Sequence, residues 1–222
     1  MEDKDFLDAY ERGRVTLDLQ NIPIKEYHWF YRVYIGLWVA KNASKLEGDF
    51  VECGVGTGFL SSSICQYLKW NSLNKNFYLL DTFNGLITSQ LTLDEQRPDL
   101  MKHNSLVYKN IDIQKIKQNF SEWKNIHIIP GVIPDTLKQV ESDKISYLHV
   151  DLNCSYPERE VFLYFYKKLV TGGFILLDDY AYYGYNSQKV MWDKLAEEYN
   201  LHILSLPTGQ GLILNVDTNH SI

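Results

Sequence analysis

The sequence predicts an α/β fold: a doubly wound, mostly parallel seven-stranded sheet with an antiparallel last strand, preceded by an N-terminal helical cap. Short β-rich runs alternate with longer amphipathic stretches, and a strand followed by a helix, repeated five times, implies right-handed crossovers between parallel strands. The last two strands are joined by a segment too short for a crossover, so we expect an antiparallel hairpin there. Neither a repeat nor a linker composition marks a boundary, so residues 1–222 are expected to form one domain.

Each predicted strand is a short run rich in β-branched, aromatic or aliphatic residues that ends at or beside Gly, Pro, Asn or Asp. These runs are residues 49–53, 76–80, 126–130, 146–151, 173–177, 201–206 and 211–215. The predicted helices have apolar residues at helical spacing and are residues 60–70, 111–123, 133–141, 158–169 and 187–199. The helical cap comprises residues 1–47 and the core residues 48–215.

The segment 87–110 is too long and too polar for an ordinary connection between a strand and a helix. We expect it to be a loop at the ligand-binding face that acts as a lid or selects the substrate. Arg97, Lys102, His103 and Lys109 would give this loop positive character, unless it is simply a solvated surface loop.

The composition excludes several classes of protein. With 22 Lys and Arg against 28 Asp and Glu, the net charge of −6 disfavours binding to nucleic acid. The most apolar early run, residues 29–40, is interrupted by Arg32 and is too short to span a bilayer, so we expect no membrane association. Cys53, Cys65 and Cys154 lack metal or disulfide spacing, which together with an acidic, non-signal N-terminus favours a cytoplasmic location.

A candidate ligand-binding turn follows the first predicted strand. Gly54, Gly56 and Gly58 lie between this strand and a helix, where the absence of side chains lets the backbone approach a ligand. Asp81 ends the second strand, where its carboxylate could accept hydrogen bonds from two ribose hydroxyls. Together these residues predict a site for a nucleoside-containing cofactor.

The glycine spacing disfavours a dinucleotide, because the G-x-G-x-x-G pattern requires glycine at its sixth position. Counted from Gly54, that position holds Phe59. Counted from Gly56, it holds Ser61. Glu52 either anchors the backbone amides of the turn or pairs with an ammonium group, which suits a cofactor with a cationic amino-acid end.

Three sequence strings resemble the macrocin O-methyltransferase family of class I S-adenosylmethionine-dependent methyltransferases. They are GDFVECGV at 48–55, DTFNGL at 81–86 and GGFILLDDY at 172–180. The resemblance extends over roughly residues 48–214. It implies a Rossmann-like class I methyltransferase fold, whose seven-stranded sheet has an antiparallel last strand.

The resemblance also implies a set of cofactor-binding residues near the strand ends. These are Glu52, Gly54, Gly56, Gly58, Asp81, Thr82, Phe83, Gly131, Val132 and Asp151. In this arrangement Glu52 and the glycines surround the methionine part of S-adenosylmethionine and Asp81 holds the ribose. Gly131 and Val132, after the third strand, border the adenine.

Three acidic residues follow the fourth and fifth predicted strands. Asp151 ends the fourth strand, and Asp178 and Asp179 end the fifth, so neighbouring strand ends would bring three carboxylates together. Uncompensated carboxylates would raise one another's pKa, and a bound divalent cation would relieve the repulsion. Oxygen ligands favour Mg²⁺ or a similar hard ion. The alternative from the residues alone is that Asp178 caps the strand end and Asp179 lies in solvent.

The macrocin family and the similar catechol O-methyltransferases place a metal on the corresponding set, which implies Asp151, Asp178 and Asp179 as ligands here. Catechol methyltransferases carry a Lys three residues after the first metal-binding Asp, where this chain has Cys154, so a lysine base does not carry over. Asn153 also stands where macrocin-type enzymes commonly have a second Asp. Asp151 or a metal-bound hydroxide is left as the base, and we assign the catalytic role to Asp151.

The predicted function is therefore S-adenosylmethionine-dependent and Mg²⁺-dependent O-methylation. The acceptor would be a hydroxyl of a sugar or another vicinal-oxygen small molecule in specialised metabolite or surface glycan biosynthesis. The ion would bind acceptor oxygens, lower the pKa of the hydroxyl and hold its oxygen in line with the methyl group. An NAD-dependent oxidoreductase with a Rossmann-type fold and a non-catalytic S-adenosylmethionine-binding module are the alternatives. Related enzymes often pair through N-terminal elements, so a homodimer is one expectation.

Two groups of aromatic residues and one histidine stay open to more than one interpretation. The cluster at residues 27–34 is interpreted as helix packing rather than a substrate platform. The tyrosines after the acidic pair either contact the acceptor or pack locally; they are Tyr180, Tyr182, Tyr183 and Tyr185. His149 is interpreted as a packed residue rather than a base.

Overall fold

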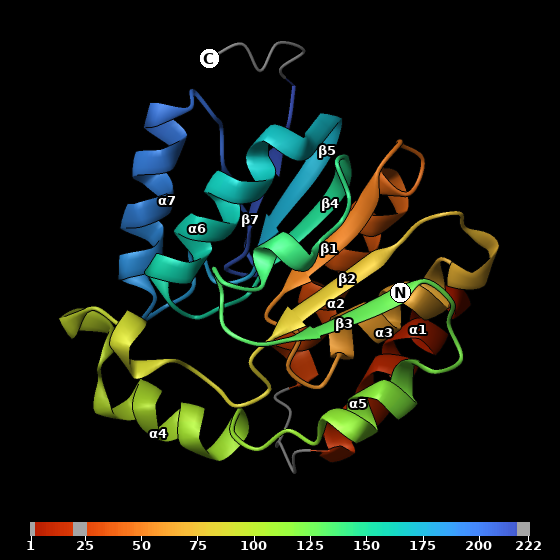
Figure 1. The fold of residues 1–222 in the computed structure, drawn as a ribbon, viewed down its shortest axis with the longest axis horizontal. Helices are drawn as coiled ribbons and strands as arrows, with labels where there is room; N and C mark the ends of the chain where they lie inside the picture. The colour runs from red at the N-terminus through yellow and green to blue at the C-terminus, as the bar shows by residue number, and fades with distance from the viewer. Residues whose placement is uncertain (1–2, 20–25, 217–222) are drawn as a thin grey trace.

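The computed structural model describes residues 3–19 and 26–216, which form one seven-stranded sheet with helices on both faces (Figure 1). The strand order is β3-β2-β1-β4-β5-β7-β6. The parallel strands are β1 (Asp49–Cys53), β2 (Phe77–Asp81), β3 (Ile126–Pro130), β4 (Ile145–Val150) and β5 (Leu169–Leu177). β7 (Gly211–Leu214) runs antiparallel to β5 and to the short β6 (Leu204–Ser205). The predicted fold class is confirmed.

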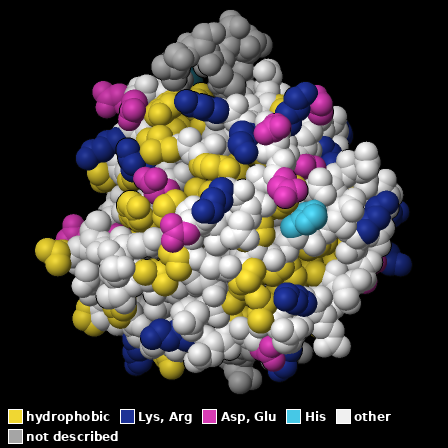
Figure 2. Space-filling view, viewed as in Figure 1, with side chains coloured by type: hydrophobic (Ala, Val, Ile, Leu, Met, Phe, Trp, Pro, Cys, Tyr) yellow, Lys and Arg dark blue, Asp and Glu magenta, His cyan; other side chains and the backbone are white. Residues whose placement is uncertain are grey.

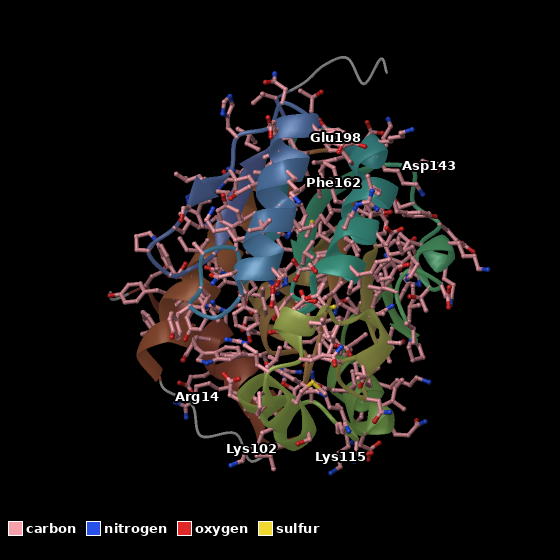
Figure 3. All side chains as sticks on the ribbon, turned by 90° about the vertical axis from the view of Figure 1, so that its left-hand side faces the viewer. Arg14, Lys102, Lys115, Asp143, Phe162 and Glu198 are labelled. Atoms are coloured by element: carbon pink, nitrogen blue, oxygen red, sulfur yellow. The ribbon has the colours of Figure 1, made fainter. Side chains whose placement is uncertain are left out.

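One helical layer contains the N-terminal helices, which pack on the sheet and on the helix that follows β1 (Figure 1). Its members are α1 (Lys4–Arg14), α2 (Glu26–Ala43), α3 (Phe59–Tyr67) and α5 (Ile113–Phe120). The other layer contains α6 (Ser155–Phe165) and α7 (Asn186–Glu198). In Figure 3, Phe162 lies on the inner side of α6, and its ring centre is 5.7 Å from that of Trp192 on α7.

The central strands are apolar on both sides because each face of the sheet is covered by helices. All six residues of β4 are buried. Phe50 and Phe77 pack with Trp70 in the core under α1–α3, whereas Leu148 and Ile175 belong to the core under α6 and α7. Each of these large side chains contributes about 1.5–3 kcal/mol by leaving water.

The helix predicted over residues 133–141 is wrong. The Ile133–Pro134 peptide bond is cis, and the segment then forms only a short 3₁₀ helix, Leu137–Gln139. The backbone N–H groups of Leu137, Gln139 and Val140 donate to carbonyl oxygens three residues back, as in a 3₁₀ helix, rather than four residues back as an α-helix requires.

The segment 87–110 is largely helical rather than an irregular loop. It contains two 3₁₀ turns, Thr88–Gln90 and Leu93–Glu95, and then α4 (Pro98–Val107). Thr92 and Glu95 form a capping box, and Pro98 occupies the start of α4, where its fixed backbone angle favours a helix. α4 lies beyond the carboxyl ends of the central strands (Figure 1).

Other differences concern element ends: the strand predicted over 201–206 is reduced to Leu204–Ser205, and the helix predicted over 158–169 is α6. Among the described residues, no helix combines the length and the apolar character needed to cross a membrane. On the face shown in Figure 2, Lys and Arg are interspersed with Asp and Glu.

Candidate functional site

A cavity of about 490 Å³ lies at the carboxyl ends of β1, β2, β4 and β5. Its wall includes Gly54, Asp81, Asp151 and Asp178, one residue after each of these strands or at its end. A cavity at the point where the strand order reverses is the usual ligand site of a doubly wound sheet, and the volume suits a small molecule.

The glycine turn between β1 and α3 is shaped by close backbone contacts. A Cβ on Gly54 would lie 1.8 Å from the backbone oxygen of Asp151, so only glycine lets the ends of β1 and β4 come together. Gly58 precedes α3 in the left-handed conformation, with φ of 84°. Gly56 has φ of 54° and open space where a Cβ would stand, so its backbone faces the cavity directly.

Asp81 holds this turn in place. Its Oδ2 accepts hydrogen bonds from the backbone N–H groups of Val55 (2.7 Å) and Gly56 (2.8 Å), and its Oδ1 accepts one from Phe83 N–H (2.7 Å). Burial raises the pKa of Asp81, and the hydrogen bonds from these amides oppose that rise. The backbone amides therefore serve as the partners of this buried carboxylate, and ribose binding by Asp81 stays a prediction.

Glu52 is buried and has one unpartnered oxygen. Its Oε1 lies 3.2 Å from Nδ1 of His149, and Oε2 has no hydrogen-bond partner within the described part of the chain. Because Asp81 anchors the turn amides, Glu52 does not perform that role. Both Glu52 and His149 line the cavity, so this buried oxygen belongs to a residue at the cavity wall.

His149 lies between the two carboxylates of Glu52 and Asp178. Its Nε2 is 3.9 Å from Asp178 Oδ1, and it also lacks a hydrogen-bond partner among the described residues. Burial alone would lower the pKa of His149, but Asp178 and Glu52 raise it to about 10. A histidine protonated in this way contributes positive charge to the cavity and is poorly suited to accept a proton at neutral pH.

The structure brings Asp151, Asp178 and Asp179 together, with one carboxylate oxygen of each within 4.8 Å of the others. The parallel pairing of β4 and β5, in which Val150 is opposite Leu177, places the residues that follow these two strands side by side. Burial, Asp178 and Asp179 raise the pKa of Asp151 well above its ordinary range.

The expectation that these carboxylates are uncompensated is wrong, because Arg32 from α2 pairs with two of them. Its Nη1 donates to Asp178 Oδ2 and its Nη2 donates to Asp179 Oδ1 at 2.8 Å. Burial alone would raise the pKa of Asp178, but Arg32 and His149 lower it to about 2. The side chain of Asp179 is only 10% exposed, so this residue does not lie in solvent.

Two further contacts hold the Arg32 guanidinium. It stacks over the ring of Tyr182 at 4.6 Å, and Nε donates to the backbone oxygen of Thr208 at 3.3 Å. Burial and Asp178 raise the pKa of Asp179 to about 6, even though Arg32 opposes that rise. Arg32 therefore connects α2, the segment after β5 and the turn before β7.

Hydrogen bonds join the helical segment 87–110 to the start of α6. Glu95 Oε1 accepts a hydrogen bond from Ser155 N–H at 2.8 Å, and Cys154 Sγ donates to Gln90 O at 3.4 Å. His103 from α4 faces the cavity. Lys102, in contrast, is exposed and lies at the outer edge of the segment in Figure 3.

The aromatic residues near the N-terminus mostly pack against one another. The Phe30 ring lies 4.8 Å from Phe6, and Trp29 stacks on Phe59 at 5.6 Å. Trp29 also lines the cavity. The side chains of Tyr27 and His28 lie outside those that the structure describes.

Not every predicted site residue borders the cavity. Gly58, Phe83, Val132 and Asp179 lie outside its immediate wall, and of the four tyrosines after β5 only Tyr182 contributes to it. The wall includes residues that the sequence reasoning missed: Arg32, Tyr108 and Ile133. The sequence did carry a signal for Arg32, as a single charge within an otherwise apolar run, but residues 108 and 133 had none.

Comparison with known proteins identifies the family. Residues 39–202 match the family described as Macrocin-O-methyltransferase (TylF). The chain is 24% identical over 145 residues to the mycinamicin III 3''-O-methyltransferase of Micromonospora griseorubida. It is 22% identical over 144 residues to the demethyldecarbamoylnovobiocin O-methyltransferase of Streptomyces niveus. These matches cover 61% and 62% of this chain and span 56% and 54% of the two relatives.

Solved structures agree on the fold. The O-methyltransferase NovP superposes with a TM-score of 0.73 at 17% identity, covering 85% of this chain and 81% of NovP. The calicheamicin methyltransferase CalS11 gives 0.68 at 13% identity, covering 98% and 95%. The family match covers most of the chain, including the glycine turn, Asp81 and the three carboxylates. The chain therefore belongs to the macrocin O-methyltransferase family.

Proposed function

We propose that this chain transfers a methyl group from S-adenosylmethionine to a hydroxyl of a small acceptor such as a sugar. Family membership supports the reaction class. The observation that carries the assignment is a single cavity, which is bordered by Glu52 with its unpartnered oxygen, by part of the glycine turn (Gly54 and Gly56) and by part of the acidic cluster (Asp151 and Asp178). One end of the cavity suits a cationic amino acid joined to a nucleoside, and the other end suits an acceptor.

The cofactor end is defined by residues after β1 and β2. Glu52 Oε2 would accept a hydrogen bond from the ammonium of the methionine part, which satisfies an otherwise unpartnered buried oxygen. The exposed backbone at Gly56 lets the cofactor approach the start of α3, where helix N–H groups favour its carboxylate. Asp81 Oδ1 can accept a further hydrogen bond, from a ribose hydroxyl.

The adenine would lie beyond the third strand. Gly131 lines the cavity there, and its N–H donates to Asp81 O at 2.9 Å. Val132 faces a separate surface hollow, whereas Ile133 lines the cavity. We therefore assign the apolar contact with the adenine ring to Ile133, since the flat face of a base packs against an apolar wall.

The acceptor end is defined by residues after β4 and β5. Three carboxylates with oxygen atoms within 4.8 Å fit a hard divalent cation such as Mg²⁺, provided that the Arg32 guanidinium leaves Asp178 and Asp179. Such an ion, when bound, lowers the pKa of an acceptor hydroxyl. Asp151 lines the cavity at this end and would take up the hydroxyl proton.

Thermal unfolding with S-adenosylhomocysteine, NAD and Mg²⁺ separates this proposal from its alternatives. We expect S-adenosylhomocysteine to raise the melting temperature. A rise with NAD alone would replace the proposal by an oxidoreductase. Binding without methyl transfer to hydroxylated acceptors would indicate a non-catalytic module, and mycinamicin III and demethyldecarbamoylnovobiocin are the first acceptors to assay with radiolabelled cofactor, given the relatives' names.

The metal is tested with EDTA and with Asp179→Asn. Both should reduce methyl transfer by at least about a hundredfold. EDTA removes the ion, and the substitution removes one of the three carboxylates that would hold it. Affinity for S-adenosylhomocysteine should stay near the wild-type value, since Asp179 lies outside the wall of the cofactor end. Full activity in EDTA and in the variant would contradict metal dependence.

A further inference from the structure

We propose that Arg32 is a resident cation of the acidic cluster, and that a divalent ion binds Asp178 and Asp179 only by displacing its guanidinium. This inference rests on the proposed function, because it concerns the metal that the acidic cluster would hold. It adds a residue from α2 that sets the affinity of that site and that the family's motif strings do not include.

The guanidinium occupies the oxygens that an ion needs. Its two terminal nitrogens engage Asp178 Oδ2 and Asp179 Oδ1 separately, in the fork geometry that suits a pair of carboxylates. The other oxygen of Asp178 accepts a hydrogen bond from Gln210 Nε2 at 3.0 Å. An ion bound to Asp178, or to Asp179 through Oδ1, would therefore replace a contact that the chain already makes.

Charge repulsion prevents both cations from sharing these oxygens. Mg²⁺ lies about 2.0–2.1 Å from its oxygen ligands, so a guanidinium in hydrogen-bond contact with the same oxygens would face a double positive charge at very short range. Burial strengthens that repulsion, because the side chains of Arg32 and Asp178 are each only 11% exposed. Among the described residues, no other Lys or Arg is ion-paired with the three carboxylates.

The Arg32 side chain has another contact available when an ion displaces it from the carboxylates. Besides the two carboxylates, the guanidinium contacts the Tyr182 ring and the backbone oxygen of Thr208. Tyr182 is 39% exposed and lines the cavity, so an arginine that leaves the carboxylates and keeps only its contact with this ring would lie at the cavity mouth. There its charge would face an incoming acceptor rather than the ion.

The test is Mn²⁺ binding to the EDTA-stripped chain. The electron paramagnetic resonance signal of the free ion measures how much Mn²⁺ remains unbound. Arg32→Met keeps an apolar stem but removes the competing cation, and we expect Mn²⁺ affinity to rise by about tenfold or more over wild type. Arg32→Lys keeps the charge without the fork, and its Mn²⁺ affinity should lie between those of wild type and Arg32→Met.

Arg12→Met is the matched control, since Arg12 also pairs with a carboxylate (Glu122, 2.8 Å) and covers a ring (Trp123, 4.7 Å), but on the outer helices. Its Mn²⁺ affinity should equal that of wild type.

A second readout follows Arg32 directly. Titration of ¹⁵N-labelled wild type with Mg²⁺ should shift the Arg32 Nε–H signal, which is assigned by its absence in Arg32→Lys. S-adenosylhomocysteine binding in each variant verifies that the cavity is intact. If Arg32→Met fails to fold, the Mn²⁺ affinity of Arg32→Lys relative to wild type decides whether the guanidinium competes with the ion.

The outcomes separate this inference from the proposed function. If wild type binds Mn²⁺ and the folded Arg32 variant binds it no more tightly, the inference is overturned while the metal site stands. The inference is also overturned if Mg²⁺ binds without moving the Arg32 signal. If no variant binds Mn²⁺ and wild type transfers methyl groups in EDTA, metal dependence fails and the inference fails with it.

Discussion

The two ends of the cavity compensate their carboxylates in different ways. At the cofactor end, Asp81 is held by backbone N–H groups of Val55, Gly56 and Phe83, which the fold itself supplies. At the acceptor end, side chains do this: Arg32 pairs with both Asp178 and Asp179, and Gln210 donates to Asp178. Backbone donors cannot leave without unfolding the turn, whereas a side chain can rotate away.

This difference indicates that the cofactor end is built before the cofactor arrives, while the acceptor end can change its cation. Substitutions at the cofactor end should therefore reduce both stability and cofactor binding. Substitutions at the acceptor end should leave cofactor binding near wild type.

Gly54→Ala should disrupt the cofactor end most. Its Cβ would lie 1.8 Å from the Asp151 backbone oxygen, and the residue has φ of 92°, so β1 and β4 would have to separate. We expect a loss of about 4 kcal/mol or more in the free energy of unfolding and no measurable S-adenosylhomocysteine binding. Chemical denaturation and calorimetry measure the two effects.

The control for this substitution is Gly172→Ala. Gly172 also has a positive φ, 79°, but a Cβ there would meet only Leu46 at 3.6 Å. The cost should fall to about 1–2 kcal/mol, that of the left-handed conformation alone. Equal losses in the two variants would mean that the close approach of β1 and β4 is unimportant.

Asp81→Asn should cost less than Gly54→Ala but act at the same end. The amide cannot accept on both sides, so at least one of the three backbone N–H groups meets another donor. We expect about 2–3 kcal/mol of lost stability and weaker S-adenosylhomocysteine binding, measured as for Gly54.

Asp49→Asn is the control for this change at the opposite end of the sheet, where Asp49 Oδ1 accepts from Asn76 N–H at 2.7 Å. Its S-adenosylhomocysteine affinity should match wild type. If Asp81→Asn also binds as wild type does, the backbone anchoring of the turn does not determine the cofactor site.

The sheet and the strand ends could be predicted because their signals are local. Apolar runs that stop at Gly54, Asp81 or Asp178 mark where each strand ends, and the topology of parallel strands then places those ends at one edge. The helix expected over 133–141 failed because buried apolar residues three apart, Leu137 and Val140, fit the 3₁₀ turn seen here as well as an α-helix. α4 was missed because it is short and polar, although Pro98 marks its start.

The partner of the acidic cluster could not be predicted, because it comes from a distant part of the chain. Arg32 precedes Asp178 by 146 residues, and no spacing rule relates them. A charge inside an apolar run indicates that the residue has a partner but not which one. Likewise, the sequence could not show that Asp81 rather than Glu52 anchors the glycine turn, since both carboxylates lie close to it.

Glu158 tests a third way of accommodating a carboxyl, with neutral partners only. It is buried on α6 and accepts hydrogen bonds from Trp192 Nε1 (2.7 Å) and Gln188 Nε2 (3.2 Å). Burial raises its pKa from 4.5 to about 8, against the opposing effect of these hydrogen bonds. Between these two values the folded state binds more protons than the unfolded state, so stability falls as pH rises and levels off above about pH 8.

Glu158→Gln should remove this dependence, because its amide and a reoriented Gln188 can keep both contacts. We expect wild type to lose about 1–3 kcal/mol relative to the variant between pH 5 and 8, measured by denaturation across that range. S-adenosylhomocysteine affinity should be the same in both. A constant difference at every pH would contradict the raised pKa.

Glu52→Gln should give the smallest effect and the most specific one. The substitution keeps the shape that contacts His149 but removes the carboxylate charge, including the unpartnered Oε2 that we assign to the cofactor ammonium. S-adenosylhomocysteine should bind about tenfold more weakly, whereas methylthioadenosine, which lacks the amino-acid end, should bind as it does to wild type. Calorimetry with both ligands measures the two affinities. Equal weakening of both ligands would mean that Glu52 acts through the shape of the turn and does not bind the ammonium. Backbone groups would then be the part of the cofactor end that recognises the cofactor.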